Sequence, residues 1–147
     1  MSLESDVRRL AATRPFSLLP RDAVQLIAFS CERRSLKAGE KLFSAGEPAD
    51  CAFLVLSGEI LLSLGSEERR VPRGALIGET ALAAEVLRGA DARAAVDSLL
   101  LRAPREVFRR VLSELPDAAA KVHANAAART RELIGRLDAL RTRAFEV

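Results

Sequence analysis

The sharpest change of pattern in the chain lies in Ala75-Leu-Ile-Gly-Glu-Thr-Ala-Leu-Ala-Ala-Glu-Val-Leu-Arg-Gly-Ala90. Its first three residues are apolar and predict the end of a strand, after which Gly78 lets the backbone turn without steric cost. Residues 79–85 are rich in Ala, Glu and Leu, which predicts one or two turns of helix. A new extended segment is expected from about Ala90. The stretch therefore predicts a strand, a glycine turn, a short helix and another strand in close succession.

This arrangement favours a site for a phosphate group. The free N–H groups at the start of a helix attract anions, and phosphate is the usual one. Arg88 follows Glu79 by nine positions and brings a guanidinium, which grips phosphate through two parallel hydrogen bonds. Glu79 repels phosphate, but its carboxylate accepts hydrogen bonds from sugar hydroxyls. The stretch therefore predicts a pocket for a sugar phosphate, with Arg93 as a rival for the role of Arg88.

The same residues resemble a known motif. Gly78-Glu-Thr-Ala-Leu82, followed by Arg88-Gly-Ala90, is similar to the phosphate-binding cassette of the cyclic nucleotide-binding domain family. Upstream, residues 37–50 resemble the early strands and turn of that family, and Phe53–Gly58 resembles its strand-turn signature. The resemblance runs from about residue 16 to residue 140, nearly the whole chain.

The resemblance implies roles for the cassette residues. Arg88 is expected to pair with the cyclic phosphate and Glu79 with the ribose 2′-hydroxyl. The backbone N–H groups of Ala81 and Gly89 would complete the phosphate site. Thr80 takes a position that is usually apolar in the family, which leaves a hydroxyl facing the site without an assigned partner.

Comparison with the family pattern selects Arg88 and also reveals two departures. From Arg88 onward the pattern continues without a gap, whereas Arg93 would require an insertion in a short loop. Leu87 stands where many members have proline, and Gly89 stands where many have Ala, Ser or Thr. These departures leave open the alternative that the chain is a structural dimerisation module of the same fold that no longer binds nucleotide.

The residue after the arginine also bears on which nucleotide is bound. In family members that prefer cGMP, a Ser or Thr hydroxyl often follows the arginine and meets the guanine amino group, but here Gly89 has no side chain. We therefore expect cAMP rather than cGMP as the ligand. Leu62 and Ile77, with Leu133 from the last helix, are expected to cover the base, and Thr130 has the hydroxyl nearest to the adenine amino group.

Composition sets the general class of protein. The chain has 147 residues, of which 49% are apolar, and a net charge of +3 from 23 basic and 20 acidic residues. Such a chain is long enough for one globular domain with its own core, and its charge is too balanced to indicate a nucleic-acid partner. No apolar run has the length of a membrane span, and the N-terminus shows no secretory signal. We therefore expect a cytoplasmic protein without a membrane partner, with Cys31 and Cys51 as free thiols.

The order of patterns along the chain predicts an α+β fold. Residues 1–31 read as short helices, with Pro20 at the start of the second. Residues 32–103 form many short apolar segments separated by glycine and proline, which is typical of an all-β sandwich or barrel. The family version is a double-sheet jelly-roll barrel. Residues 104–147 predict two C-terminal helices, the first over residues 105–114 with Val107, Val111 and Leu112 inward and the last one long.

The long helix carries an apolar seam close to a heptad repeat. After Pro116, as far as about residue 143, there is no proline and one glycine. The apolar or small residues at seam spacing are Val122, Ala126, Thr130, Leu133, Leu137, Leu140 and Ala144. One interpretation is a helix that packs on its own barrel. The other, which the length of the seam favours, is a parallel two-stranded coil that makes a homodimer.

Catalytic and metal-binding residues are not predicted anywhere in the chain. His123 is the single histidine, and we expect it to be solvated, so the histidine cluster of a jelly-roll metalloenzyme is missing. No Ser/His/acid or Cys/His pairing is apparent. The sequence ends without a helix-turn-helix, the segment with which activators of this family read DNA. The hypothesis is therefore a non-enzymatic sensor domain over residues 1–147, without a nucleic-acid partner, in which the ligand favours one arrangement of the long helix.

Overall fold

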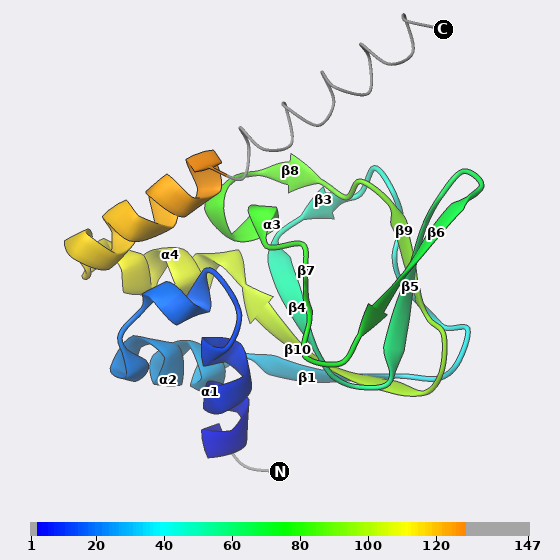
Figure 1. The fold of residues 1–147 in the computed structure, drawn as a ribbon, viewed down its shortest axis with the longest axis horizontal. Helices are drawn as coiled ribbons and strands as arrows, with labels where there is room; N and C mark the ends of the chain where they lie inside the picture. The colour runs from blue at the N-terminus through cyan, green and yellow to red at the C-terminus, as the bar shows by residue number, and fades with distance from the viewer. Residues whose placement is uncertain (1–2, 129–147) are drawn as a thin grey trace, which may run out of the picture.

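A computed structural model of the chain describes residues 3–128. They build an α+β fold in which the helices lie at one end of the molecule and the antiparallel sheets at the other (Figure 1). The N-terminal helical elements are α1 (Leu3–Ala11), η1 (Phe16–Leu18) and α2 (Arg21–Ser30). After the strands come α4 (Arg105–Ser113) and a helix that begins at Pro116 and is described as far as residue 128. Pro20 directly precedes α2, as its missing N–H predicts.

Two four-stranded antiparallel sheets form the sandwich. In the first sheet the order is β1 (Glu32–Leu36), β10 (Ser98–Pro104), β4 (Cys51–Ser57) and β7 (Leu76–Ile77). In the second it is β2 (Lys41–Phe43), β9 (Asp91–Ala94), β5 (Glu59–Leu64) and β6 (Glu67–Pro72). A separate short pair joins β3 (Pro48–Ala49) to β8 (Val86–Leu87), on either side of α3 (Thr80–Ala83) in the chain order. The double-sheet jelly-roll topology expected from the sequence is confirmed.

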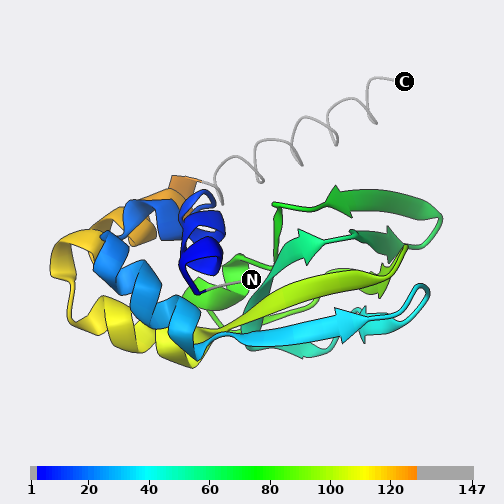
Figure 2. The same ribbon diagram turned by 90° about the horizontal axis from the view of Figure 1, so that it is seen from below.

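Strand β4 explains how one apolar run serves two cores. Residues 51–56 are all buried, although successive side chains of a strand point to opposite faces. Leu54 and Leu56 belong to the core under the helices, which also contains Phe16 and Phe108 in edge-to-face contact. Phe53 and Val55 belong to the second core, between the two sheets. A continuous apolar run is the expected pattern for a strand covered on both faces. Figure 2 shows the helices gathered at one end of the strands.

A charged pair fastens the first helix to the sheet. Asp6 of α1 is buried and accepts two hydrogen bonds from Nη2 of Arg33 in β1, at 2.9 and 2.8 Å. Nη1 of Arg9 donates to the carbonyl oxygen of Leu56 at the far end of β4, at 2.9 Å. These contacts connect residues distant in sequence, so the position of α1 depends on the sheet.

Strand β6 ends the order of the second sheet and pairs there with β5. Four of its six residues in succession are charged, Glu67 to Arg70, and they are exposed. The strand therefore presents charges at a sheet edge, where an apolar strand would invite pairing with other chains.

The helices after the sandwich differ in detail from expectation. In α4 the fully covered side chains are Phe108 and Leu112, while Val107 and Val111 pack on the core from partly exposed positions. Val122 of the next helix is buried and His123 is exposed, whereas the predicted seam beyond Ala126 lies outside the described residues. Among the described helices, none has the length and apolar character needed to cross a bilayer.

Candidate functional site

A cavity of about 220 Å³ opens between the sandwich and the cassette helix α3. Its walls come from strands of both sheets, the β3–β8 pair, α3 and the segment after β8. The residues that line it are Phe43, Ala49, Leu62, Ile77, Gly78, Thr80, Ala81, Val86, Leu87, Arg88, Gly89 and Ala90. Seven of the residues predicted for the ligand site are therefore in one cavity: Leu62, Ile77, Gly78, Thr80, Ala81, Arg88 and Gly89. Thr130 and Leu133 lie outside the described residues.

The guanidinium of Arg88 is the charged group of this cavity. Its residue is only 8% exposed. Nη2 donates to the carbonyl oxygen of Cys51 at 3.0 Å and lies 3.3 Å from the Cys51 Sγ. The guanidinium carbon stands 4.4 Å from the ring centre of Phe43 and 5.5 Å from that of Phe53. Within residues 3–128 no carboxylate forms an ion pair with Arg88, so a buried cation is held by a carbonyl, a thiol and two aromatic faces.

Gly78 makes room for this guanidinium. Its φ of +74° belongs to the region that side-chain-bearing residues rarely adopt. A Cβ placed there would lie 2.4 Å from Nη1 of Arg88. The glycine expected from the sequence as a turn residue therefore has a second reason to be glycine, which is the close approach of the arginine head group.

Backbone N–H groups at the start of α3 donate to carbonyl oxygens within the cassette itself. The N–H of Ala81 donates to the carbonyl oxygen of Gly78 at 3.0 Å, and the N–H of Leu82 donates to that of Glu79. The Ala81 amide predicted for the phosphate thus completes the first turn of α3 here. Gly89 lines the cavity, and an added Cβ there would meet no atom within 4 Å.

Glu79 is not among the residues that line the Arg88 cavity. It lines a neighbouring apolar pocket of about 240 Å³ together with Pro15, Phe108 and Val122. Thr80 borders both this pocket and the Arg88 cavity. The structure therefore brings Arg88 together with Gly78, Thr80, Ala81 and Gly89 in one cavity, whereas Glu79 lines the adjacent pocket.

Arg93, the rival arginine, points away from the cavity. It belongs to β9, opposite Leu61 of β5, and its Nη2 lies 3.7 Å from Oε1 of Glu68 in an exposed ion pair. Arg93 is not among the cavity residues. The arginine chosen from the family spacing is the buried one.

Three neighbours of the Arg88 guanidinium were not predicted as site residues. Phe43 and Phe53 lie in segments that resemble the family's strands, and their ring centres are 6.2 Å apart in a stacked arrangement. Cys51 read as a buried thiol, which it is. Nothing in the local sequence relates these residues to Arg88, because the contacts join segments 35 or more positions apart.

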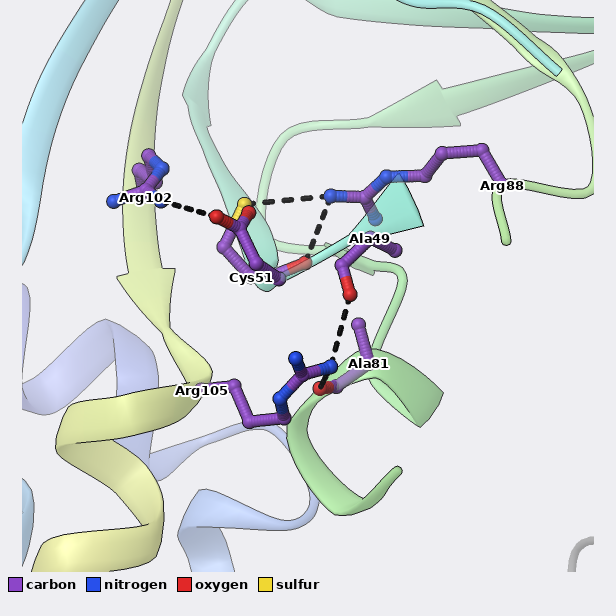
Figure 3. A network of polar contacts seen from close by, with 7 residues as sticks. Ala49, Cys51, Ala81, Arg88, Arg102 and Arg105 are labelled. Atoms are coloured by element: carbon purple, nitrogen blue, oxygen red, sulfur yellow. Dashed lines mark hydrogen bonds and ion pairs between the residues drawn. The ribbon is translucent and has the colours of Figure 1, made fainter. Parts of the chain in front are cut away.

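The segment before Cys51 carries opposing electrostatic effects. Burial raises the pKa of the Cys51 thiol, and the nearby Arg102 and Arg88 guanidiniums oppose that rise only in part. Burial also acts to raise the pKa of Asp50, but the hydrogen bond from the Cys51 thiol and the Arg102 guanidinium outweigh it, so that pKa is lowered. Asp50 Oδ2 and Arg102 Nη2 lie 3.3 Å apart (Figure 3). Asp50 is therefore an anion, and Cys51 a neutral thiol, beside the buried arginine.

Metal binding has no support in the described part of the chain. No group of three His, Cys, Asp or Glu side chains between residues 3 and 128 is arranged to hold an ion. The chemistry available in the cavity is that of a cationic hydrogen-bond donor surrounded by apolar walls. Such a site is suited to binding an anionic group attached to a larger, partly apolar molecule.

Comparison with solved structures gives the same architecture. A cyclic nucleotide-binding-like protein from Brucella abortus is 37% identical, with a TM-score of 0.68, over 74% of this chain and 98% of that one. The catabolite activator protein of Thermus thermophilus is 34% identical, with a TM-score of 0.66, over 83% of this chain and 60% of that one. The regulatory domain of Toxoplasma gondii PKA, solved with cAMP, is 26% identical, with a TM-score of 0.70, over 81% of this chain and 46% of that one.

Comparison by sequence adds relatives that are much longer proteins. Lysophospholipase NTE1 of Phaeosphaeria nodorum is 29% identical over 129 residues, and its counterpart in Neosartorya fischeri is 30% identical over 131 residues. The chain spans about 8% of the length of each of these proteins. The family model of the cyclic nucleotide-binding domain matches residues 33–114, more than half of the chain. Together with the cavity and its buried arginine, this match establishes that the chain belongs to the cyclic nucleotide-binding domain family.

Proposed function

We propose that this chain is a non-enzymatic sensor domain that binds a cyclic nucleotide, with cAMP preferred, in the Arg88 cavity. The observation that carries the proposal is the Arg88 guanidinium, a buried cation with no carboxylate partner among residues 3–128. Burying a charge is costly unless it is paired, and a phosphate anion in the cavity would supply the missing pair. The domain is further proposed to be one unit over residues 1–147, cytoplasmic, and without a nucleic-acid or membrane partner.

The size of the cavity suggests how the ligand lies. Pockets for small molecules usually occupy roughly 300–1,000 Å³, so in a cavity of about 220 Å³ we expect the sugar phosphate inside and the base nearer the mouth. Leu87 stands there with 64% of its surface exposed and would gain cover from the base. Glu79 would reach the ribose 2′-hydroxyl by a movement of α3, because it now faces the neighbouring pocket.

The phosphate would use N–H donors of Arg88 that are not directed at Cys51. A guanidinium has five N–H donors, and the described contacts of Arg88 use Nη2. The ligand can therefore be bound without the loss of the Cys51 carbonyl contact. Movement of the cassette would then favour one arrangement of the helices that follow the sandwich, and the long C-terminal helix is proposed to carry that change within a homodimer.

Calorimetry of the purified protein with cAMP and with cGMP tests the proposal. Arg88→Gln should weaken binding by about 2–5 kcal/mol, since a charge-assisted contact to phosphate is lost. Arg88→Lys should also weaken it, because an ammonium cannot reproduce the planar fork. Arg93→Gln is the matched control and should bind like wild type. If instead Arg93→Gln abolishes binding and Arg88→Gln does not, the phosphate site has been assigned to the wrong arginine.

The base preference is tested at Gly89. A bound guanine would bury its amino group without a partner there, at a cost of about 1–3 kcal/mol. The space around Gly89 admits a side chain, so Gly89→Thr should narrow the gap between the two nucleotides by improving cGMP. Gly89→Val has the same shape without the hydroxyl and should not improve cGMP. Equal affinities in the wild type would place the determinant of base preference elsewhere.

A second candidate function is a structural dimerisation module that has lost its ligand. The position of Glu79 outside the Arg88 cavity favours it, as does the closed first turn of α3. A dimeric wild-type protein that binds neither cAMP nor cGMP would support this reading over the sensor.

A further inference from the structure

Three consecutive carbonyl groups separate the cavity from helix α4. The carbonyl oxygen of Cys51 accepts from Arg88 Nη2 at 3.0 Å. The preceding carbonyl, of Asp50, accepts from the backbone N–H of Arg105 at 2.8 Å. The one before it, of Ala49, accepts from Nη1 of the Arg105 side chain at 2.9 Å. One short segment of backbone is thus held by the cavity arginine on one side and by the first residue of α4 on the other (Figure 3).

The Arg105 side chain also reaches the cassette helix. The same Nη1 lies 3.0 Å from the carbonyl oxygen of Ala84 and 3.3 Å from that of Ala81. These carbonyls belong to the C-terminal end of α3, where a cation is favoured by the unsatisfied oxygens. Helix α3 has four residues, too few to be stable on its own backbone hydrogen bonds. A partner outside the helix therefore matters more here than it would for a long helix.

Arg105 acts on the cavity without touching it. Ala49 and Ala81 both line the cavity, from β3 and from α3, whereas Arg105 is not among the lining residues. The guanidinium holds the carbonyls of these two walls from behind, as Figure 3 shows. Arg105 therefore links the β3 and α3 walls of the cavity, in addition to the packing of Leu82 in the core.

We propose that Arg105 is a positioning residue for the nucleotide site, which fixes the cassette helix against β3 and ties both to α4. The inference rests on the proposed function, because it assigns to Arg105 an effect on nucleotide affinity. A movement of α3 on ligand binding must either carry Arg105 and the start of α4 with it or break the Ala81 and Ala84 contacts. Because Arg105 is the first residue of α4, a change in the position of the cassette would be passed directly to that helix.

A purely structural role makes a different prediction. If Arg105 only adds stability, its loss should lower the unfolding temperature, but the folded protein should bind nucleotide as before. If Arg105 positions the cassette, the folded protein should show a looser α3 and a weaker site. Arg105→Met keeps a side chain of moderate length without charge or donors, and Arg105→Lys restores a charged donor. Arg109→Met, at an exposed position of the same helix, is the matched control.

Two measurements on the whole chain decide between these roles. Amide hydrogen exchange in the free protein should be about tenfold faster in Arg105→Met at Leu82 and Ala84, and unchanged in β4 and β10, since a charge-assisted contact is removed locally. Calorimetry with cAMP should show affinity weakened about tenfold, a loss of the order expected for a hydrogen bond to a charged group. Arg105→Lys should recover part of both effects, and Arg109→Met should show neither.

The outcomes separate this inference from the proposed function. Unchanged exchange in Arg105→Met overturns the hold on α3, and faster exchange with unchanged cAMP affinity reduces Arg105 to a structural tie. If exchange in Arg105→Met is faster in β4 and β10 as well, that variant is destabilised as a whole, and Arg105→Lys decides instead. The positioning role is then wrong if Arg105→Lys keeps β4 and β10 protected but binds cAMP as weakly as Arg105→Met. A wild-type protein that binds neither nucleotide overturns the proposed function itself and the positioning role with it, whatever the exchange shows.

Discussion

The environment of Arg88 is the feature that most clearly distinguishes the site. A guanidinium is weakly hydrated for a cation and stacks favourably on aromatic faces, which makes Phe43 and Phe53 suitable neighbours for its burial. The carbonyl of Cys51 fixes its direction. The arginine is thereby pre-arranged in the cavity instead of extending into solvent. Its side chain would therefore lose less conformational entropy when a ligand binds.

At Gly78 the structure predicts a specific effect of a single methyl group. Gly78→Ala should lower the free energy of unfolding by about 1–2 kcal/mol, because its φ is +74°. It should also displace the Arg88 guanidinium, whose Nη1 would lie 2.4 Å from the new Cβ, and so weaken nucleotide binding. Denaturant unfolding and calorimetry measure the two effects separately.

Gly74→Ala is the control for this prediction. Gly74 has a φ of +89°, and an added Cβ there meets no atom within 4 Å. It should cost similar stability without changing nucleotide affinity. Equal loss of affinity in both variants would show that backbone strain, and not displacement of Arg88, is the cause.

The two thiols should be unreactive in the folded protein. Burial raises the pKa of Cys31 to about 12, with Asp6 adding to the rise and Arg102 opposing it, and burial raises the pKa of Cys51. The thiolate is the reactive form, so a disulfide reagent at pH 8 should label both cysteines only after unfolding. Since the folded pKa of Cys31 is above the ordinary value of 9.0, its contribution to stability is complete below pH 9 and is lost as pH rises from 9 towards 12. Rapid labelling of the native protein would contradict the raised pKa values of the two thiols.

At the scale of single elements, we expect the Asp6–Arg33 pair between α1 and β1 to contribute to the free energy of unfolding. Asp6→Ala should lower the free energy of unfolding by about 1–3 kcal/mol, because both hydrogen bonds from Arg33 Nη2 are lost from a largely buried position. Glu4→Gln, at an exposed position of the same helix, should change it by less than about 0.5 kcal/mol. The two values come from denaturant titrations, and similar values for both variants would mean that the pair adds little.

The sequence predicted elements better than it predicted contacts between them. Short apolar segments separated by glycine and proline located the strands over residues 32–103, and Pro20 located the start of α2. The cassette was predicted because its spacing is local to residues 75–90. The Cys51 contact of Arg88 and the three carbonyl contacts of Arg105 were not predicted, since they join segments that only the folded sandwich brings together. Glu79 was assigned to the same pocket as Arg88 from spacing and the family resemblance; it lines the adjacent pocket, and its contact with the ribose stays a prediction.

For the whole molecule, the seam of the long helix predicts association. Its leucines lie beyond the described residues, so the prediction rests on their spacing. Leu133→Asp and Leu137→Asp should convert a dimer into monomers in sedimentation, with the far-ultraviolet spectrum of the sandwich retained. Arg136→Asp, off the seam, is the control and should stay dimeric. A wild-type protein that sediments as a monomer at high concentration would make the homodimer wrong.

The charged outer strand β6 has a consequence for the behaviour of the chain in concentrated solution. Amyloid-like fibrils stack identical segments in register, each residue above its own copy. In such a stack Glu67 and Glu68 would each face another glutamate, and Arg69 and Arg70 another arginine, and like charges directly opposite destabilise a strand pair. Strand β6, at the edge of the second sheet, is therefore unsuited to seed a fibril. Repulsion between like-charged side chains protects the sandwich at this edge.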